Sequence, residues 1–285
     1  MSTRTLPDGE KSAVIGMRKL EGSFLKKIPI AHRGYHTSEF PENSLPAAEN
    51  AIKHGYAIEL DIRVTKDNRI IVFHDEYAKR LLGLEGRIGQ YTYDEIKDID
   101  ILGVKGVHVP LFSEFLECVN GRMPLLIELK ACFGKKGFVQ NVVDILRQYK
   151  GEFAIQTFNP FDLIKLKKIA PEFIRGQLIT KDLSEMPREN FRDRAGYFIV
   201  WLFGFTRFNW ISAPDFFNID IRCYGKYQKR YAIRNVLTFV VTNEEEYNRA
   251  MRCTDNVVFE NMEVEHVEHQ NLQKQDLPPE EYEAR

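Results

Sequence analysis

Cysteine is scarce in this sequence, and the cysteines present form no pattern that would build a zinc site or a disulfide framework. The chain of 285 residues has four, and none belongs to a Cys-x-x-Cys pair. Widely spaced single cysteines are typical of thiols kept in a reducing compartment. We therefore expect four unpaired, buried thiols: Cys118, Cys132, Cys223 and Cys253.

Long apolar runs are missing as well. The longest, residues 197–205, has nine residues, which is about half the length that a bilayer span requires. The first thirty residues contain six basic side chains and no apolar stretch of signal-peptide length. We expect a cytoplasmic protein that has no transmembrane segment; peripheral contact with the membrane surface stays open but is not favoured.

An excess of charge of one sign is also absent. The chain has 40 basic and 41 acidic side chains, a formal net charge of −1. This balance argues against a nucleic-acid-binding protein, whose affinity depends on a basic surface. Hydrophobic residues make up 44% of the chain and aromatic residues 12%, which is enough to bury a sizeable core and excludes intrinsic disorder. The composition gives no indication of the oligomeric state.

What the chain does contain is an alternation of strand-like apolar runs and helix-like segments, without an internal repeat or a long linker. Such an alternation predicts βα units around a parallel sheet or barrel. The eight expected strands are residues 28–32, 57–61, 125–130, 154–158, 176–179, 216–220, 237–241 and 257–260. Helices are expected at residues 45–54, 136–149, 161–169 and 244–253.

Residues 64–73 differ, because two β-rich runs flank the turn-prone Lys66-Asp67-Asn68. This pattern predicts a β-hairpin. The expected fold is therefore α/β: a TIM (β/α)8 barrel over residues 28–262, with a β-hairpin insertion after the second strand. Residues 1–27 are expected to form a loosely ordered arm and residues 263–285 a polar tail.

Polar residues stand where the predicted strands end, which is where the chemistry of such a barrel is located. They are His32 and Arg33; Glu59 and Asp61; Glu128 and Lys130; and His74 at the end of the hairpin. Residues two apart in a strand point to the same face. A single pair of this kind is more often a solvated face or a structural histidine. Four such ends favour a functional site, because buried charges are costly unless they bind an ion or one another.

These residue types suit phosphoryl chemistry. The three carboxylates favour a hard divalent cation, Mg²⁺ or Ca²⁺, over zinc. Arg33 and Lys130 suit an anion such as a phosphate. His32 and His74 can act as a general acid and base near neutral pH. Together they predict metal-dependent chemistry on a phosphodiester.

Five ordered motifs carry a family resemblance: His32-Arg33-Gly34, Pro41-Glu42-Asn43-Ser44, Glu59-Leu60-Asp61, Val72-Phe73-His74-Asp75 and Glu128-Leu129-Lys130. Weaker matches follow in residues 156–160, 175–178 and 214–216. Each motif is weak alone, but the ordered set is specific. From about residue 28 to residue 260, the sequence resembles the glycerophosphodiester phosphodiesterase family.

The resemblance implies a TIM-barrel hydrolase that uses one divalent cation. Its implied substrates are deacylated phospholipids such as glycerophosphocholine, and its implied products are glycerol 3-phosphate and an alcohol. The implied roles are metal ligation for Glu59, Asp61 and Glu128; acid/base catalysis for His32 and His74; phosphate binding for Arg33 and Lys130; and support of the site for Glu42 and Asn43.

Two positions depart from the family pattern. Val240-Val241-Thr242-Asn243 replaces a stretch that often contains a tryptophan, and Phe259-Glu260 stands where many members have Thr-Asp. The resemblance implies that both contact the glycerol or headgroup side of the substrate. For the aromatic segment 197–210 we favour packing against the core over an apolar patch at the barrel mouth that accepts an acyl chain.

Two other functions stay open at this point: a lysophospholipase D-like phosphodiesterase and a non-catalytic phosphodiester-binding barrel. The histidine pair argues against the binding barrel, because binding alone needs no acid and base. The attacking group is either a metal-activated water or the glycerol 2-hydroxyl of the substrate, and the histidine pair favours the hydroxyl. His36, His54 and His108 lack partners at metal-ligand spacing, and we expect them to be surface or structural residues.

Overall fold

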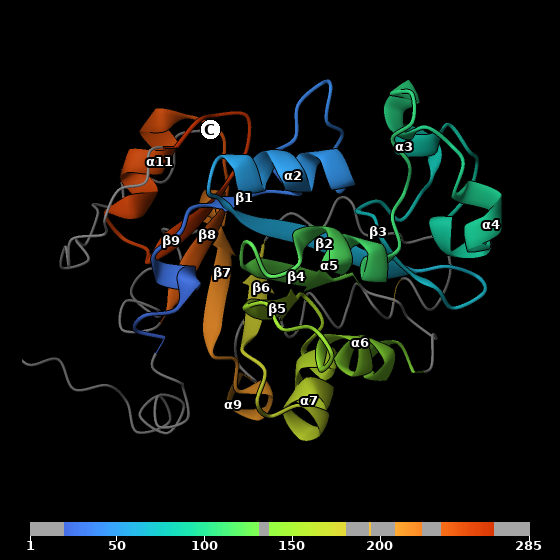
Figure 1. Ribbon diagram of the computed structural model, residues 1–285. Helices are drawn as coiled ribbons and strands as arrows, with labels where there is room; N and C mark the ends of the chain where they lie inside the picture. The colour runs from blue at the N-terminus through green and yellow to red at the C-terminus, as the bar shows by residue number, and fades with distance from the viewer. Residues whose placement is uncertain (1–19, 131–136, 181–193, 195–208, 224–234, 265–285) are drawn as a thin grey trace, which may run out of the picture.

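Eight parallel strands close into a barrel in the computed structural model, which describes residues 20–130, 137–180, 194, 209–223 and 235–264 (Figure 1). Around the barrel the strands follow the order β1-β2-β4-β5-β6-β7-β8-β9, and β9 pairs again with β1. Their bounds are β1 (Ile30–Ala31), β2 (Ala57–Val64), β4 (Leu125–Leu129), β5 (Phe153–Thr157), β6 (Arg175–Ile179), β7 (Phe216–Asp220), β8 (Val236–Val241) and β9 (Asn256–Phe259). The predicted TIM barrel is confirmed.

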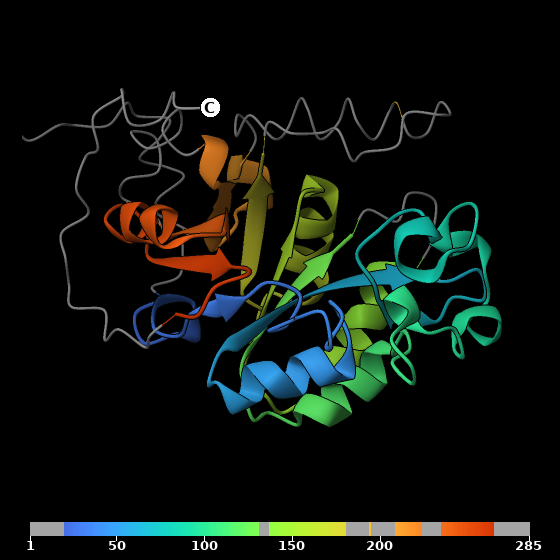
Figure 2. The same ribbon diagram turned by 90° about the horizontal axis from the view of Figure 1, so that it is seen from above.

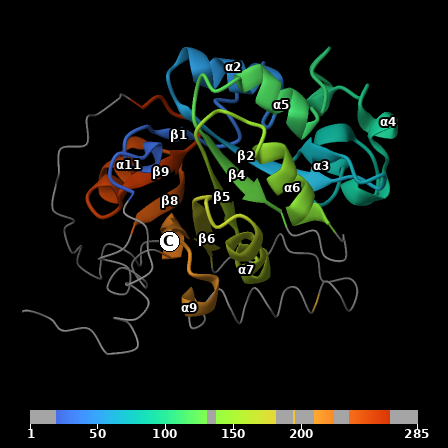
Figure 3. The ribbon, with the colours of Figure 1, turned by 60° about the horizontal axis from the view of Figure 1, so that its bottom comes forward.

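Helices lie around the outside of the strands (Figures 1 and 3). They are α2 (Leu45–Lys53), α5 (Phe112–Val119), α6 (Phe138–Leu146), α7 (Pro160–Ile169), α9 (Asn209–Ser212) and α11 (Glu244–Met251). Helix α2 begins where Ala47 N–H donates to the side chain of Ser44, the usual cap of a helix start. The four predicted helices are present within three residues of their expected ends, as expected for helix ends that fray. Helix α5 was not predicted.

The hairpin predicted after the second strand is present. Strand β2 continues to Val64 and pairs antiparallel with β3 (Ile70–Val72), with Arg63 opposite Ile71. Asn68 in the turn has a φ of 64°, a conformation that asparagine tolerates better than most residues.

The hairpin opens a larger insertion, residues 65–111, that the sequence did not predict. It contains α3 (Lys79–Leu82), η2 (Ile88–Gln90), α4 (Tyr93–Ile96) and η3 (Ile101–Gly103), and it projects beside the barrel (Figure 2). Its buried apolar side chains form a cluster separate from the barrel core. This insertion therefore has a small core of its own.

The segment before β1 closes the amino-terminal end of the barrel. Phe24 and Leu25, both in η1 (Phe24–Lys26), are buried and belong to the same cluster as Phe216 and other residues near the strand starts. Ile28 O accepts a hydrogen bond of 2.7 Å from Asn256 Nδ2. Residues 20–27 were expected as part of a loosely ordered arm, and they are instead packed on the barrel. Residues 1–19 and 265–285 lie outside the described residues.

Gly176 on β6 makes room for the ring of Phe216 on β7. A Cβ at position 176 would lie 2.1 Å from Phe216 Cζ. We expect Gly176→Ala to lower the free energy of unfolding by about 1–3 kcal/mol, as overpacking of cores does. Chemical denaturation measures this loss. Gly89→Ala is the control, because a Cβ there would lie 3.4 Å from its nearest neighbour; equal stabilities of the two variants would contradict the prediction.

Three further sequence predictions have different outcomes. Cys223 and Cys253 are buried as expected, whereas Cys118 is partly exposed and contacts Glu49. Cys132 and the aromatic segment 197–210 lie outside the residues whose side chains are described. None of the described helices is long and apolar enough to cross a bilayer.

Candidate active site

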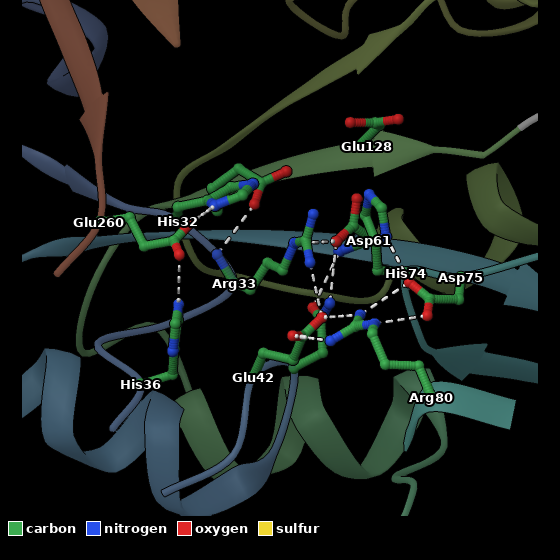
Figure 4. A network of polar contacts seen from close by, with 12 residues as sticks. His32, Arg33, His36, Glu42, Asp61, His74, Asp75, Arg80, Glu128 and Glu260 are labelled. Atoms are coloured by element: carbon green, nitrogen blue, oxygen red, sulfur yellow. Dashed lines mark hydrogen bonds and ion pairs between the residues drawn. The ribbon is translucent and has the colours of Figure 1, made fainter. Parts of the chain in front are cut away.

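Three buried carboxylates lie close together on β2 and β4, and Figure 4 labels two of them, Asp61 and Glu128. Asp61 and Glu128 are direct partners in the parallel register of these strands, and Glu59 lies two residues before Asp61 on the same face. One oxygen of each of the three lies within 4.8 Å of the others. Their exposed fractions are 6% or less, so the barrel interior holds a compact group of acids.

The charge of this group is only partly balanced. Lys130 Nζ lies 2.9 Å from Asp61 Oδ1 and 2.7 Å from Glu128 Oε1, yet both oxygens are buried without a well-aligned hydrogen bond. Burial and the neighbouring acids raise the pKa of Glu59 well above its usual value, and burial also raises the pKa of Glu128. Burial opposes ionisation of Asp61 too, but Lys130 and the other nearby cations hold its pKa well below the usual value. Three oxygen donors with an excess of negative charge fit a hard divalent cation.

A tight turn after β1 brings Arg33 onto this group. Arg33 has a φ of 55° and Gly34 a φ of 81°, and a Cβ at Gly34 would lie 3.0 Å from the backbone of Ala47. The turn directs Arg33 N–H at Glu59 Oε2, 3.0 Å away. The guanidinium donates through Nη1 to Glu42 over 2.7 Å. Arg33 is thus held by main chain and side chain together.

Asn43 and Glu42, for which the resemblance implies a supporting role, make different contacts in this region. Asn43 Nδ2 donates to Asp61 Oδ2 over 2.8 Å, and Asn43 Oδ1 accepts from Asp61 N–H over 3.1 Å. Glu42 accepts hydrogen bonds from Arg33 and from Arg80. Burial opposes ionisation of Glu42, but these two guanidinium groups lower its pKa.

His74 follows β3 and pairs with its neighbour in the chain. Its Nδ1 lies 2.8 Å from Asp75 Oδ1, and Asp75 also accepts two hydrogen bonds of 2.7 Å from Arg80. Burial, with Lys130 nearby, lowers the pKa of His74 to about 4. Arg80 was missed by the sequence analysis, because it lies in α3, a helix too short to show periodicity.

His32 pairs with a carboxylate from the far end of the barrel sequence. His32 Nδ1 lies 2.5 Å from Glu260 Oε2, and Glu260 Oε1 accepts from Asn261 and lies 3.7 Å from His36 Nε2. The bond to His32 lowers the pKa of Glu260 to about 2, and burial lowers the pKa of His32. Glu260 was expected on the glycerol or headgroup side, and in the structure it contacts His32. His36, expected at the surface or in a structural place, lies beside the site.

The other departure from the family pattern has a local structural role. Asn243 Oδ1 accepts from Glu246 N–H at the start of α11, and Glu246 in turn accepts from Thr242 N–H. Thr242 and Asn243 therefore take part in capping α11, in the manner of a capping box.

Comparisons with known proteins show which family this chain is similar to. The model described as the glycerophosphoryl diester phosphodiesterase family matches residues 32–204, more than half of the chain. A glycerophosphodiester phosphodiesterase of Caldanaerobacter subterraneus subsp. tengcongensis is 33% identical over 172 residues, which cover 56% of this chain and 70% of that protein. A human lysophospholipase D is 30% identical over 141 residues, 45% of this chain and 43% of that protein.

Solved structures show the same fold. A phosphodiesterase from Oleispira antarctica, in complex with the product sn-glycerol-3-phosphate, has a TM-score of 0.63 at 23% identity, covering 81% of this chain and 93% of that one. A glycerophosphodiester phosphodiesterase from Thermotoga maritima has a TM-score of 0.61 at 23% identity, covering 82% and 94%. With the sequence matches, the conclusion is that the chain belongs to the glycerophosphoryl diester phosphodiesterase family and is an enzyme of it.

Proposed function

We propose that the protein hydrolyses glycerophosphodiesters, the deacylated forms of phospholipids, to glycerol 3-phosphate and an alcohol. The observation that carries this proposal is the pairing of two histidines with two carboxylates around one group of cations and acids. Figure 4 shows the His32–Glu260 and His74–Asp75 pairs on either side of Arg33. The relatives named as glycerophosphodiester phosphodiesterases support the substrate class.

We assign the metal site of the proposed enzyme to Glu59, Asp61 and Glu128. Their donor atoms are all carboxylate oxygens, which Mg²⁺ and Ca²⁺ prefer, and two of these oxygens are buried without a well-aligned hydrogen bond. A divalent cation held by these residues would supply positive charge to the phosphoryl oxygens of the substrate. Arg33 and Lys130 would hold the same phosphate, the first through a planar fork and the second as a point charge.

His32 and His74 are proposed as the acid/base pair. A carboxylate at Nδ1 selects the tautomer and leaves proton transfer to Nε2. One imidazole removes a proton from the attacking group, and the other protonates the departing alkoxide. Each carboxylate also stabilises its imidazole in the protonated form, which burial alone disfavours.

The attacking group in this proposal is the glycerol 2-hydroxyl of the substrate. Its attack on phosphorus breaks the bond to the leaving alkoxide and gives a cyclic 1,2-phosphate, which water then opens with the histidine roles reversed. The hydroxyl is held next to phosphorus by the substrate itself, so the step gains from proximity. A substrate with hydrogen in place of the 2-hydroxyl should therefore turn over at least ~100-fold more slowly. Steady-state kinetics compare the two substrates, and equal turnover would establish direct attack by water.

Glu260 is expected to support His32 in this chemistry. Glu260→Gln keeps the size of the side chain but removes the charge that orients and stabilises the imidazole, so kcat should fall by about 10- to 100-fold. Glu260→Asp keeps the charge on a shorter side chain and should retain more activity than the glutamine variant. A glutamine variant with wild-type kcat would exclude this role.

The experiment that tests the proposed function measures product release from a panel of substrates with Mg²⁺ or Ca²⁺. Glycerol 3-phosphate should form from glycerophosphocholine or glycerophosphoethanolamine. Turnover of lysophosphatidylcholine alone would favour the lysophospholipase D-like alternative, which the human relative suggests. Saturable binding of the same diesters without any product would show a binding barrel.

A further inference from the structure

Two arginines and two acids alternate in a row at the edge of the site, and His74 ends the row (Figure 4). Arg33 donates to Glu42 over 2.7 Å, and Glu42 accepts from Arg80 over 2.6 and 2.8 Å. Arg80 also donates to both oxygens of Asp75 over 2.7 Å, and Asp75 lies 2.8 Å from His74 Nδ1. One guanidinium thus stands in the middle of a continuous chain of contacts.

Arg80 joins parts of the chain that have no sequence proximity. It lies on α3, whose neighbouring side chains Leu81 and Leu82 are anchored in the core of the insertion. Glu42 lies 38 residues away, in the loop between β1 and α2. The planar guanidinium offers donors on two edges, so it can bind two carboxylates at once, which an ammonium group cannot do with the same geometry.

Arg80 lies between two carboxylates, where a positive charge is needed to offset their repulsion. Glu42, Asp75 and His74 offer ligand atoms within 4.8 Å of one another, and two carboxylates at that distance repel unless a positive charge lies between them. The guanidinium lowers the pKa of both acids. Without it, the two acids would move apart or take up a proton, and either change would disturb the groups that they hold.

We propose that Arg80 is a positioning residue that aligns two groups of the site at once: Arg33, through Glu42, and His74, through Asp75. This inference rests on the proposed function, in which Arg33 binds the phosphate and His74 transfers a proton. The two branches have different kinetic effects. The Glu42 branch acts on phosphate binding and hence on KM, whereas the Asp75 branch acts on proton transfer and hence on kcat.

Four substitutions test the proposal, and two of them, Glu42→Gln and Asp75→Asn, separate the branches. Arg80→Ala should lower kcat/KM by about 10- to 100-fold, with KM raised and kcat reduced together. Glu42→Gln should mainly raise KM, and Asp75→Asn should mainly lower kcat. Arg80→Lys, which keeps the charge but cannot span both acids, should stay close to Arg80→Ala. If the alanine variant fails to fold, Arg80→Lys tests the proposal in its place.

Lys79→Ala is the matched control, because Lys79 lies on the same helix, is 64% exposed and pairs with Glu85. Its kinetic constants should stay within about 2-fold of wild type, since surface ion pairs contribute little. A wild-type protein without turnover of glycerophosphodiesters would refute the proposed function. An active wild type with an equally active Arg80→Ala would refute the positioning role of Arg80 alone.

Chemical rescue distinguishes positioning from a general loss of structure. The Arg80 side chain is 46% exposed, so a small cation can reach the space that Arg80→Ala leaves. Guanidinium at non-denaturing, millimolar concentration should raise the activity of this variant several-fold, and ammonium at equal ionic strength should not, because only a planar fork matches both carboxylates. Failure of guanidinium to exceed ammonium would overturn the proposal.

Discussion

Removal of divalent cations by a chelator is expected to abolish turnover of glycerophosphodiesters, and Mg²⁺ or Ca²⁺ is expected to restore it. The reason is the group formed by Glu59, Asp61 and Glu128, three acids beside which Lys130 lies within 3 Å of two and Arg33 Nε lies 3.5 Å from Asp61. Without added positive charge, these acids cannot all be ionised in a buried place. The check is to measure turnover and the metal content of the protein in parallel. Full activity in a protein that contains no metal would contradict the prediction.

Variants of the same group extend this prediction to stability. Glu59→Ala should lose most activity but keep or gain thermal stability, because it removes the acid whose pKa burial and its neighbours raise most clearly. Asp61→Ala should lose activity and stability, because it removes one of the two acids that pair with Lys130 and leaves the Asn43 amide without its acceptor. Thermal unfolding measures the melting temperatures of the two variants and of the wild type. A Glu59→Ala protein that melts well below Asp61→Ala would contradict it.

Replacement of His32 or His74 by alanine is expected to lower kcat by roughly 10²- to 10⁴-fold each, the usual contribution of a general acid or base. The double variant should lose far less than the product of the two single losses, because the two residues act in one proton-transfer sequence. His108→Ala is the control, since His108 is paired with Asp100 in the insertion and should leave kcat unchanged. A near wild-type kcat in either single variant would remove that histidine from the pair.

The barrel strands could be predicted from the sequence because each is an apolar run with polar residues at its end. Asp61 and Glu128 could be expected at one place, since parallel strands in a barrel end at the same edge. The insertion could not be predicted in the same way. Its helices have three or four residues, which is about one turn and too short for the periodicity that identifies a helix. The packing of residues 20–27 on the barrel was not predicted, because a single Phe-Leu pair shows no periodicity.

The carboxylate that pairs with His74 could be predicted from the sequence, whereas the carboxylate that pairs with His32 could not. Asp75 follows His74 directly and lies in a recognised motif. Glu260 lies 228 residues from His32, and nothing in local sequence links two residues at that distance. Their contact depends on the closure of the barrel, and so does the approach of His36 to Glu260. Arg80 depends on the fold of the insertion, which the sequence pattern did not show.

The seam where the barrel closes has a consequence for how the molecule becomes active as it folds. Strand β1 has two residues and pairs with both β2 and β9, and His32 N–H donates across the seam to Phe259 O. Contacts between the two ends of a long chain form late, because the entropy of closing the intervening loop must be overcome first. The acids on β2 and β4 are much closer in sequence and can assemble earlier. During refolding, the capacity to hold a cation should therefore return before catalysis, which waits for the first and last strands to meet.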